Sequence, residues 1–277
     1  MEGVRPPTPI AGDAGRRDGS IAIVVLTHNR MHLLRKCAEN VLSRTSTATQ
    51  EIVIWNNGSG DGTGRYLDAL DDPRLAIVHH STNIGQNAYA RAFAMTSADY
   101  LIDLDDDVVN APPRWDEILL DAFRRLPTIG LLSADLEDDP HDLATHYRHR
   151  VYEYTATEIN GLQLLLGPTG GACAITSREL YDRVGGFRER KKHVFFLEDE
   201  AYVLDLQSLG YGAAVLADLR VLHTGGSFYS TEPKEKEEFW RRRNRTIARK
   251  EVVKRVLFRL PFFRSLNAQF SWCVPPS

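Results

Sequence analysis

The chain has 277 residues, of which 43% are hydrophobic, 26% charged and 9% aromatic, and its formal net charge at pH 7 is −3. These values are ordinary for a folded domain and exclude a chain that is disordered throughout. The small negative charge gives no reason to expect a nucleic acid partner, because phosphate backbones attract basic surfaces. Three widely spaced cysteines without a preceding secretory signal predict a cytoplasmic protein. No apolar run reaches the length of about 18 residues that a membrane span needs.

Residues 1–18 mix proline, glycine and charge without periodicity, so we expect a flexible leader there. Four apolar runs of strand length follow, and segments with helical spacing separate them; the runs are IAIVVLT (21–27), EIVIWNN (51–57), RLAIVHH (74–80) and YLIDLD (100–105). Such alternation predicts an α/β fold with a doubly wound, Rossmann-like, mostly parallel sheet flanked by helices. Ligands of such sheets bind beyond the carboxyl ends of the strands. Polar clusters follow all four runs, and we expect the functional site at that edge.

After residue 113 the pattern changes. Residues 115–126 predict an amphipathic helix, and residues 162–187 predict a strand, a glycine pair and a helix. Acidic residues open a further predicted helix within 195–211, and residues 212–226 return as a strand. Residues 231–277 begin as a charged helical pattern, which predicts a helical C-terminal extension.

Four carboxylates in five positions, in the stretch DLDDD, end the fourth run. Alternation along a strand sends Asp105 and Asp107 to one side and Asp106 to the other, while Asp103 belongs to the strand itself. Two carboxylates at a strand end suit a hard divalent cation, and Mg²⁺ or Mn²⁺ with a diphosphate is the natural occupant. The alternative is a solvated acidic turn or a cap for the next helix.

Six segments, taken together and in this order, resemble family-2 glycosyltransferases of the GT-A fold. They are IVVLTHNR, IVIWNNGSGDGT, NIGQNAYARAF, the run into LDDDV before two prolines, GGACAITSRELYDRVGGF and FFLEDEAYVLDLQSLGY, which lie between about residues 20 and 226. The resemblance implies metal-dependent, inverting transfer of a hexosyl or deoxyhexosyl group from a UDP, dTDP or GDP sugar. The implied acceptor is a hydroxyl of a glycan, a lipid-linked molecule or a secondary metabolite, as in polysaccharide biosynthesis. It further implies one GT-A domain over 19–230, with the nucleotide in 19–113 and the acceptor in 114–230.

The first half contains the implied nucleotide-binding residues. Thr27, His28 and Arg30 match the loop that wraps the nucleotide, with His28 in place of the more usual tyrosine. Asn56 stands where an aspartate commonly accepts a hydrogen bond from the base. An amide oxygen also accepts, so uracil, thymine and guanine all stay open.

Further positions follow from the same resemblance. Asn83 and Arg91 match the segment beside the nucleotide, although Arg91 has the alternative of pairing with a surface carboxylate. Asp105 and Asp106 resemble the part of the aspartate motif nearest the ribose and the metal, and Asp107 resembles the principal metal ligand.

The second half contains the implied catalytic residues. Glu198 and Asp199 match the acidic pair at a helix start, where Asp199 resembles the general base; the alternative is that both only complement the helix dipole. Gly170 and Gly171 permit close backbone approach and are expected to floor the acceptor or sugar pocket, or else to form a plain turn. His223 resembles a histidine that some relatives place near the metal, against the alternative of a structural role.

Between Arg241 and Arg264 basic side chains interleave with apolar ones, as in a helix on an anionic membrane surface. We therefore expect peripheral contact with the inner face of the membrane through 240–264, with packing on the catalytic domain as the alternative. Two other functions stay open. A nucleotidyltransferase also brings carboxylates to a nucleotide, but THNRMHLL lacks the glycines of a phosphate loop. A non-catalytic nucleotide-sugar-binding scaffold would need no base.

Overall fold

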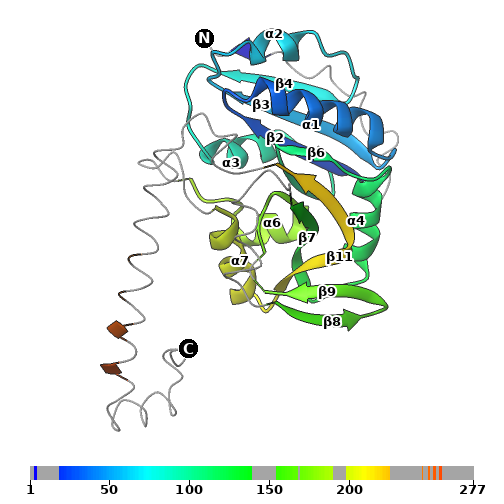
Figure 1. The fold of residues 1–277 in the computed structure, drawn as a ribbon, viewed down its shortest axis with the longest axis vertical. Coiled ribbons are helices and arrows are strands. Elements are labelled where there is room, and N and C mark those ends of the chain that lie inside the picture. Colours follow the sequence, from blue (N-terminus) through cyan, green and yellow to red (C-terminus); the bar gives the residue numbers. More distant parts are fainter. Residues whose placement is uncertain are drawn as a thin grey trace. The chain divides into compact units, whose positions relative to one another are not determined.

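The computed structural model describes residues 3–4, 19–138, 154–167, 169–189 and 198–224, and six positions between 245 and 257. The chain divides into two compact units, Met1–Thr231 and Glu232–Ser277. This division lies one residue from the boundary that the sequence predicts between the main domain and its extension. Figure 1 shows the first unit as a sheet with helices packed along it.

The first half of this unit alternates strands and helices. Its described elements are β1 (Gly3–Val4), β2 (Ile21–Thr27), α1 (Met31–Arg44), β3 (Thr49–Asn57), α2 (Thr63–Asp68), β4 (Leu75–His80), α3 (Asn87–Phe93), β5 (Tyr100–Asp105) and β6 (Val108–Asn110). The second half has α4 (Trp115–Arg124), β7 (Ile129–Asp138), β8 (Thr155–Ile159), β9 (Leu162–Leu166), β10 (Cys173–Ser177), α6 (Arg178–Val184), α7 (Glu198–Ser208) and β11 (Gly212–His223).

A single sheet connects the two halves. Among the described residues its strand order is β1-β4-β3-β2-β5-β10-β7-β11-β9-β8, and β6 pairs with β11 outside this path. Strands β4, β3, β2 and β5 are parallel, β10 is antiparallel between β5 and β7, and β11 is parallel to β7. The parallel, helix-flanked centre confirms the predicted α/β class.

One sequence expectation needs correction. Residues 162–187 contain two strands, β9 and β10, where we expected one, because LQLLL pairs with β8 and β11 while CAITS pairs with β5 and β7.

The flexible leader over residues 1–18 stays a prediction, although Gly3 and Val4 within it pair with the edge strand β4. An edge strand offers unpaired backbone groups to any extended segment, and local composition does not reveal this. The rest of the leader lies outside the described residues.

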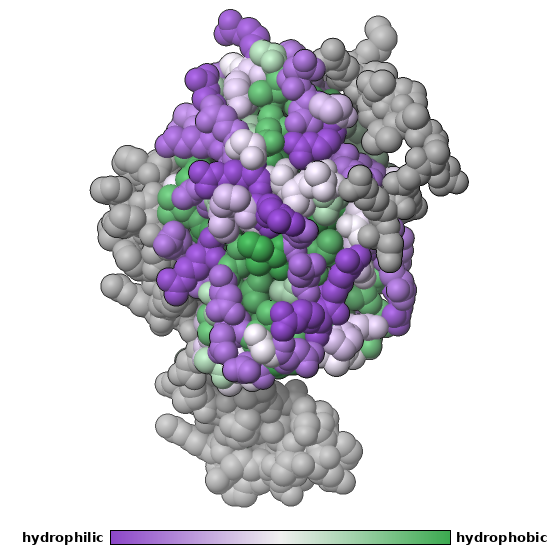
Figure 2. Space-filling view, turned by 90° about the vertical axis from the view of Figure 1, so that its right-hand side faces the viewer, coloured by the Kyte–Doolittle hydropathy of each residue, from purple (hydrophilic) through white to green (hydrophobic). Residues whose placement is uncertain are grey.

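The core fills both faces of the central strands. Ile21 to Val25 are at most 1% exposed, as expected for a parallel strand covered on both sides. Helix α4 is amphipathic and buries Trp115, Leu119 and Phe123, while Ile118 is 42% exposed. The face of the molecule that carries α4 is mostly hydrophilic, with a smaller hydrophobic area near its middle (Figure 2).

The second unit is described only at Arg245, Arg249, Val252, Val253, Val256 and Leu257, all of them helical. The predicted membrane contact through 240–264 otherwise lies outside the described residues. None of the described helices is both long and apolar enough to cross a membrane.

Candidate active site

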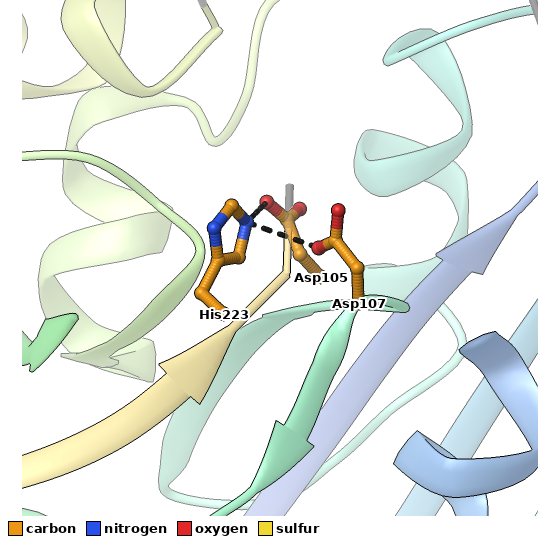
Figure 3. Close-up of side chains that lie close together, drawn as sticks. All are labelled: Asp105, Asp107 and His223. Atoms are coloured by element: carbon orange, nitrogen blue, oxygen red, sulfur yellow. Dashed lines mark ion pairs between the residues drawn. The ribbon is translucent and has the colours of Figure 1, made fainter. Parts of the chain in front are cut away.

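Two carboxylates and an imidazole converge where β5 and β11 end (Figure 3). The His223 Nε2 atom lies 3.4 Å from Asp105 Oδ2 and 3.0 Å from Asp107 Oδ1. One ligand atom from each of the three residues falls within 4.8 Å of the others. This spacing allows one small cation to contact all three.

Strand pairing brings these distant residues together. After Asp105 the chain turns into β6, and β6 pairs antiparallel with the end of β11, so that His223 lies opposite Val108. The Thr224 backbone N–H donates to the Asp107 carbonyl oxygen at 3.0 Å, which fixes the turn against β11. The Tyr89 hydroxyl of α3 donates to Asp105 Oδ1 at 3.3 Å.

The third carboxylate of the motif has protein partners. Asp106 accepts hydrogen bonds from the Thr27 hydroxyl and from Arg30, both at 2.7 Å. The other arm of the Arg30 guanidinium donates to Asp107 Oδ2 at 2.7 Å. Arg30 therefore bridges two buried carboxylates, a fork geometry that lysine does not reproduce. Nucleotide contacts through Thr27, Arg30 and Asp106 stay predictions.

The electrostatics of this cluster follow from burial and opposite charge. Burial alone lowers the pKa of Arg30, but the charges of Asp106 and Asp107 raise it above its usual value. Burial raises the pKa of Asp106 to about 7, although the Arg30 charge opposes this shift. Burial opposes protonation of His223, yet Asp107 and Asp105 raise its pKa to about 10. Without a cation, the imidazolium thus takes the place of a positive ion between the carboxylates.

A second acidic group lies at the start of α7. The Gly171 N–H donates to Asp199 Oδ2 at 3.1 Å, and the Glu200 N–H donates to Asp199 Oδ1 at 2.7 Å. A Cβ at Gly170 would lie 3.2 Å from Asp199 Oδ2, and one at Gly171 would lie 2.5 Å from Asp103 Oδ2. The glycine pair therefore lies against the carboxylates of Asp103 and Asp199, and its expected role as the floor of an acceptor or sugar pocket stays a prediction.

Burial sets the protonation of these acids. A small pocket is lined by Asp103 and Asp199 together with apolar side chains such as Phe93 and Phe187. Burial raises the pKa of Asp199, although its two backbone hydrogen bonds oppose the shift, and the charge of Asp105 adds to it. Burial and then the charge of Asp199 raise the pKa of Glu198 well above its ordinary value. A carboxylate with a raised pKa suits proton abstraction by a general base, and the assignment of Asp199 as that base stays a prediction.

The expected nucleotide residues surround the carboxyl ends of β2, β3 and β4. His28 Nδ1 lies 2.8 Å from the Asn57 carbonyl oxygen. Asn56 is 5% exposed, and its side chain contacts His79 and the Ser59 N–H. These positions agree with one shared edge of the sheet, while their contacts with a nucleotide stay predictions.

Asn83 and Arg91 have protein partners as well. Asn83 Oδ1 accepts from Asn57 Nδ2 at 2.9 Å and from the Gly85 N–H at 2.8 Å. Arg91 Nε lies 3.2 Å from Glu189 Oε1, and both side chains are nearly half exposed. The structure thus contains the surface pair that was the alternative for Arg91.

Sequence reasoning missed three contributors to the site, Tyr89, Asp103 and Thr224. Tyr89 lies in the first turn of the helical segment NAYARAF, and its distance from Asp105 in sequence gives no sign of contact. Asp103 is 5% exposed beneath the glycine pair, and burial followed by the charges of Asp105 and Glu198 raises its pKa well above the ordinary value.

The sequence itself places the chain in a known family. Residues 22–185, more than half of the chain, match the family model of glycosyl transferase family 2, and the chain belongs to this family. It is 24% identical over 211 residues to the uncharacterized protein y4gI of Sinorhizobium fredii (strain NBRC 101917 / NGR234), which covers 69% of this chain. It is 28% identical over 101 residues to the putative colanic acid biosynthesis glycosyl transferase WcaA of Escherichia coli (strain K12), which covers 36% of this chain. The chain spans 23% and 36% of the length of these two relatives.

Two solved structures share its architecture. The mannosyltransferase PcManGT from Pyrobaculum calidifontis, solved with GDP-Man and Mn²⁺, aligns with a TM-score of 0.51 and 20% identity over 74% of this chain and 56% of its own. GalNAc-T7, solved with UDP, GalNAc and Mn²⁺, aligns with a TM-score of 0.59 and 14% identity over 74% of this chain and 44% of its own. These likenesses confirm the GT-A fold of the first unit.

Proposed function

We propose that this chain is a metal-dependent, inverting glycosyltransferase that moves a sugar from a nucleotide diphosphate to an acceptor hydroxyl. The observation that carries the proposal is the convergence of Asp105, Asp107 and His223, together with the half-buried base candidate Asp199, whose pKa the charge of Asp105 raises further. Membership in glycosyl transferase family 2 favours this function over a nucleotidyltransferase.

The donor atoms of the proposed metal site suit a divalent cation. Two carboxylates and one imidazole are ligands that Mn²⁺ accepts, and Mg²⁺ accepts the carboxylates. Asp105, Asp107 and His223 would hold the cation, which when bound neutralises the charge that develops on the leaving diphosphate. The two structural neighbours were solved with Mn²⁺, which supports the choice of that ion.

The chain itself provides the base. Asp199 takes the proton of the acceptor hydroxyl while the acceptor oxygen bonds to the anomeric carbon and the bond from that carbon to the diphosphate breaks. Attack opposite the leaving group inverts the configuration at that carbon. The Gly171 and Glu200 N–H groups fix the two oxygens of Asp199, so the carboxylate is oriented before the acceptor arrives.

The first experiment is a thermal-shift screen of the full chain against UDP, GDP and dTDP sugars, each with Mn²⁺, Mg²⁺ or EDTA. We expect a rise in Tm that needs the metal and is largest for one nucleotide, because a ligand stabilises the state that binds it. Asp107→Ala should abolish the metal-dependent part, whereas Asp182→Asn, an exposed change on α6, should preserve it. If no nucleotide raises Tm at millimolar concentration, the proposed donor site is wrong.

The base is tested with the identified donor and its acceptor. Asp199→Asn should bind the donor normally and lose transfer. Nuclear magnetic resonance of the product that the wild type makes should show an inverted anomeric centre. Normal transfer by Asp199→Asn would refute the base assignment. Donor binding by the wild type without any transfer or hydrolysis would instead favour the non-catalytic scaffold.

We propose in addition that segment 240–264 contacts anionic lipid and brings the enzyme to a membrane-bound acceptor. Its basic and apolar residues interleave, and Val252 and Val256 are helical and more than half exposed. The full chain should sediment with vesicles that contain phosphatidylglycerol, less so at high salt, and not with neutral vesicles. The Val252→Asp/Val256→Asp variant should stay in the supernatant, and equal sedimentation of both proteins would remove this proposal.

A further inference from the structure

Three side chains contact one another in series on the predicted nucleotide side of the first unit. Asn56 of β3 and His79 of β4 lie opposite each other in the parallel ladder, and Asn56 Nδ2 is 3.0 Å from His79 Nδ1. The other ring nitrogen, Nε2 of His79, lies 3.2 Å from Asp68 Oδ1 at the end of α2. Neither His79 nor Asp68 belongs to the motifs that identify the family in this sequence.

The hydrogen-bonding groups of these three side chains decide which way the Asn56 amide faces. A carboxylate only accepts hydrogen bonds, so a His79 ring that carries one proton has it on Nε2, the atom that faces Asp68. The Nδ1 atom is then an acceptor, and the Asn56 group that faces it must be the Nδ2 donor. Asn56 Oδ1 consequently faces the other way, where it accepts from the Ser59 N–H at 3.1 Å. Both ends of the amide thus require the same orientation.

The oxygen faces the turn after β3, which lies at the edge of the sheet where the nucleotide is expected. Ser59 lies in the turn after β3, and its hydroxyl accepts from the Asn29 N–H at 2.9 Å. In the same turn, the Gly60 N–H donates to Asn29 Oδ1 at 2.7 Å. Asn29 follows His28 in the loop at the carboxyl end of β2. The loop after β2 and the turn after β3 are therefore hydrogen-bonded to each other, and the same turn donates to the amide oxygen.

We propose that His79 is a positioning residue that sets the base preference of the donor site. By holding the amide of Asn56 with its oxygen toward the base, His79 makes the site select bases whose facing ring nitrogen is an N–H donor, as in uracil, thymine and guanine. Cytosine presents an acceptor nitrogen at the corresponding position and is rejected, because two acceptors would face each other. This inference rests on the proposed function, since it assumes a nucleotide at this edge.

The test compares the affinities of the full chain for UDP, dTDP, GDP and CDP in the presence of Mn²⁺, measured by isothermal titration calorimetry. In His79→Ala the amide is free to rotate, and the preference for the best of the first three nucleotides over CDP should fall about tenfold, the range of one hydrogen bond. His79→Asn places an amide oxygen near the position of Nδ1 and should restore the preference. His80→Ala, one position along the same strand, is the matched control and should keep it.

A second measurement does not depend on a nucleotide. Long-range proton–nitrogen correlations of the wild type should show the His79 proton on Nε2, and a proton on Nδ1 would overturn the inference. An unchanged base preference in a folded His79→Ala variant would overturn it as well. If the wild type binds none of the four nucleotides, the proposed donor site fails, and base selection fails with it even when the tautomer is as expected.

Discussion

Gly171→Ala tests the packing between the two carboxylates beneath the site. The added Cβ would lie 2.5 Å from Asp103 Oδ2 and 3.6 Å from Asp199 Cβ, and the first distance is shorter than real Cβ atoms tolerate. Overpacking of this kind costs about 1–3 kcal/mol. For a domain of this size about 2–4 °C of Tm accompany each kcal/mol. We therefore expect Tm to fall by roughly 2–12 °C.

The position of the clash predicts a graded series. Gly170→Ala should be milder, because its Cβ would lie 3.2 Å from Asp199 Oδ2. Gly60→Ala is the control, since no atom lies within 4 Å of its Cβ position, and it should change stability by less than about 0.5 kcal/mol. Transfer activity should fall with Gly171→Ala and Gly170→Ala, because both substitutions place a new Cβ close to Asp199 and disturb its position.

The assay is a double-mutant cycle by urea unfolding, followed through tryptophan fluorescence. Asp103→Ala removes the oxygen that the new methyl group would meet, so Gly171→Ala should cost less in that background, with a coupling of about 0.5–3 kcal/mol. A Gly171→Ala variant as stable as the wild type, or additive effects of the two changes, would refute the reasoning. The Gly60→Ala control shows whether any loss is specific to the carboxylate contact.

Three other outcomes follow from the site. In EDTA, Tm should fall as the pH rises from 5 to 9. Folding raises the pKa of Asp106 from 3.8 to about 7 and that of His223 from 6.5 to about 10. Both groups therefore stabilise the fold at low pH, and this stabilisation is lost as the pH rises through the folded pKa values. Excess Mg²⁺ should lessen that fall, which a pH series of thermal unfolding measures. Arg30→Lys should lower Tm more than the exposed change Arg35→Lys, because one ammonium cannot bridge Asp106 and Asp107. Equal losses would contradict the bridging role.

The local sequence was enough for the central sheet. Continuous apolar runs such as Ile21–Thr27 predicted strands that are buried on both faces. The helical spacing between these runs predicted helical connections, which join parallel strands. The sequence also placed Asp105 and Asp107 together at the end of a strand. Strand alternation was the wrong reason for this, because β5 ends at Asp105 and Asp107 lies in the turn that follows it. Short-range periodicity is a property of neighbouring residues, so it can be recognised in the sequence without the tertiary structure.

Contacts between distant segments required the tertiary structure. His223 reaches Asp107 only because β6 pairs with the end of β11, and Arg30 reaches it only because β2 lies beside β5. The β10 strand enters antiparallel between β5 and β7, which sets Gly171 against Asp103. Strand order and register follow from the packing of the whole core, where many small contacts decide together. The sequence by itself determined the four parallel strands of the first half and the acidic motif, whereas the tertiary structure decided which distant side chains complete the site.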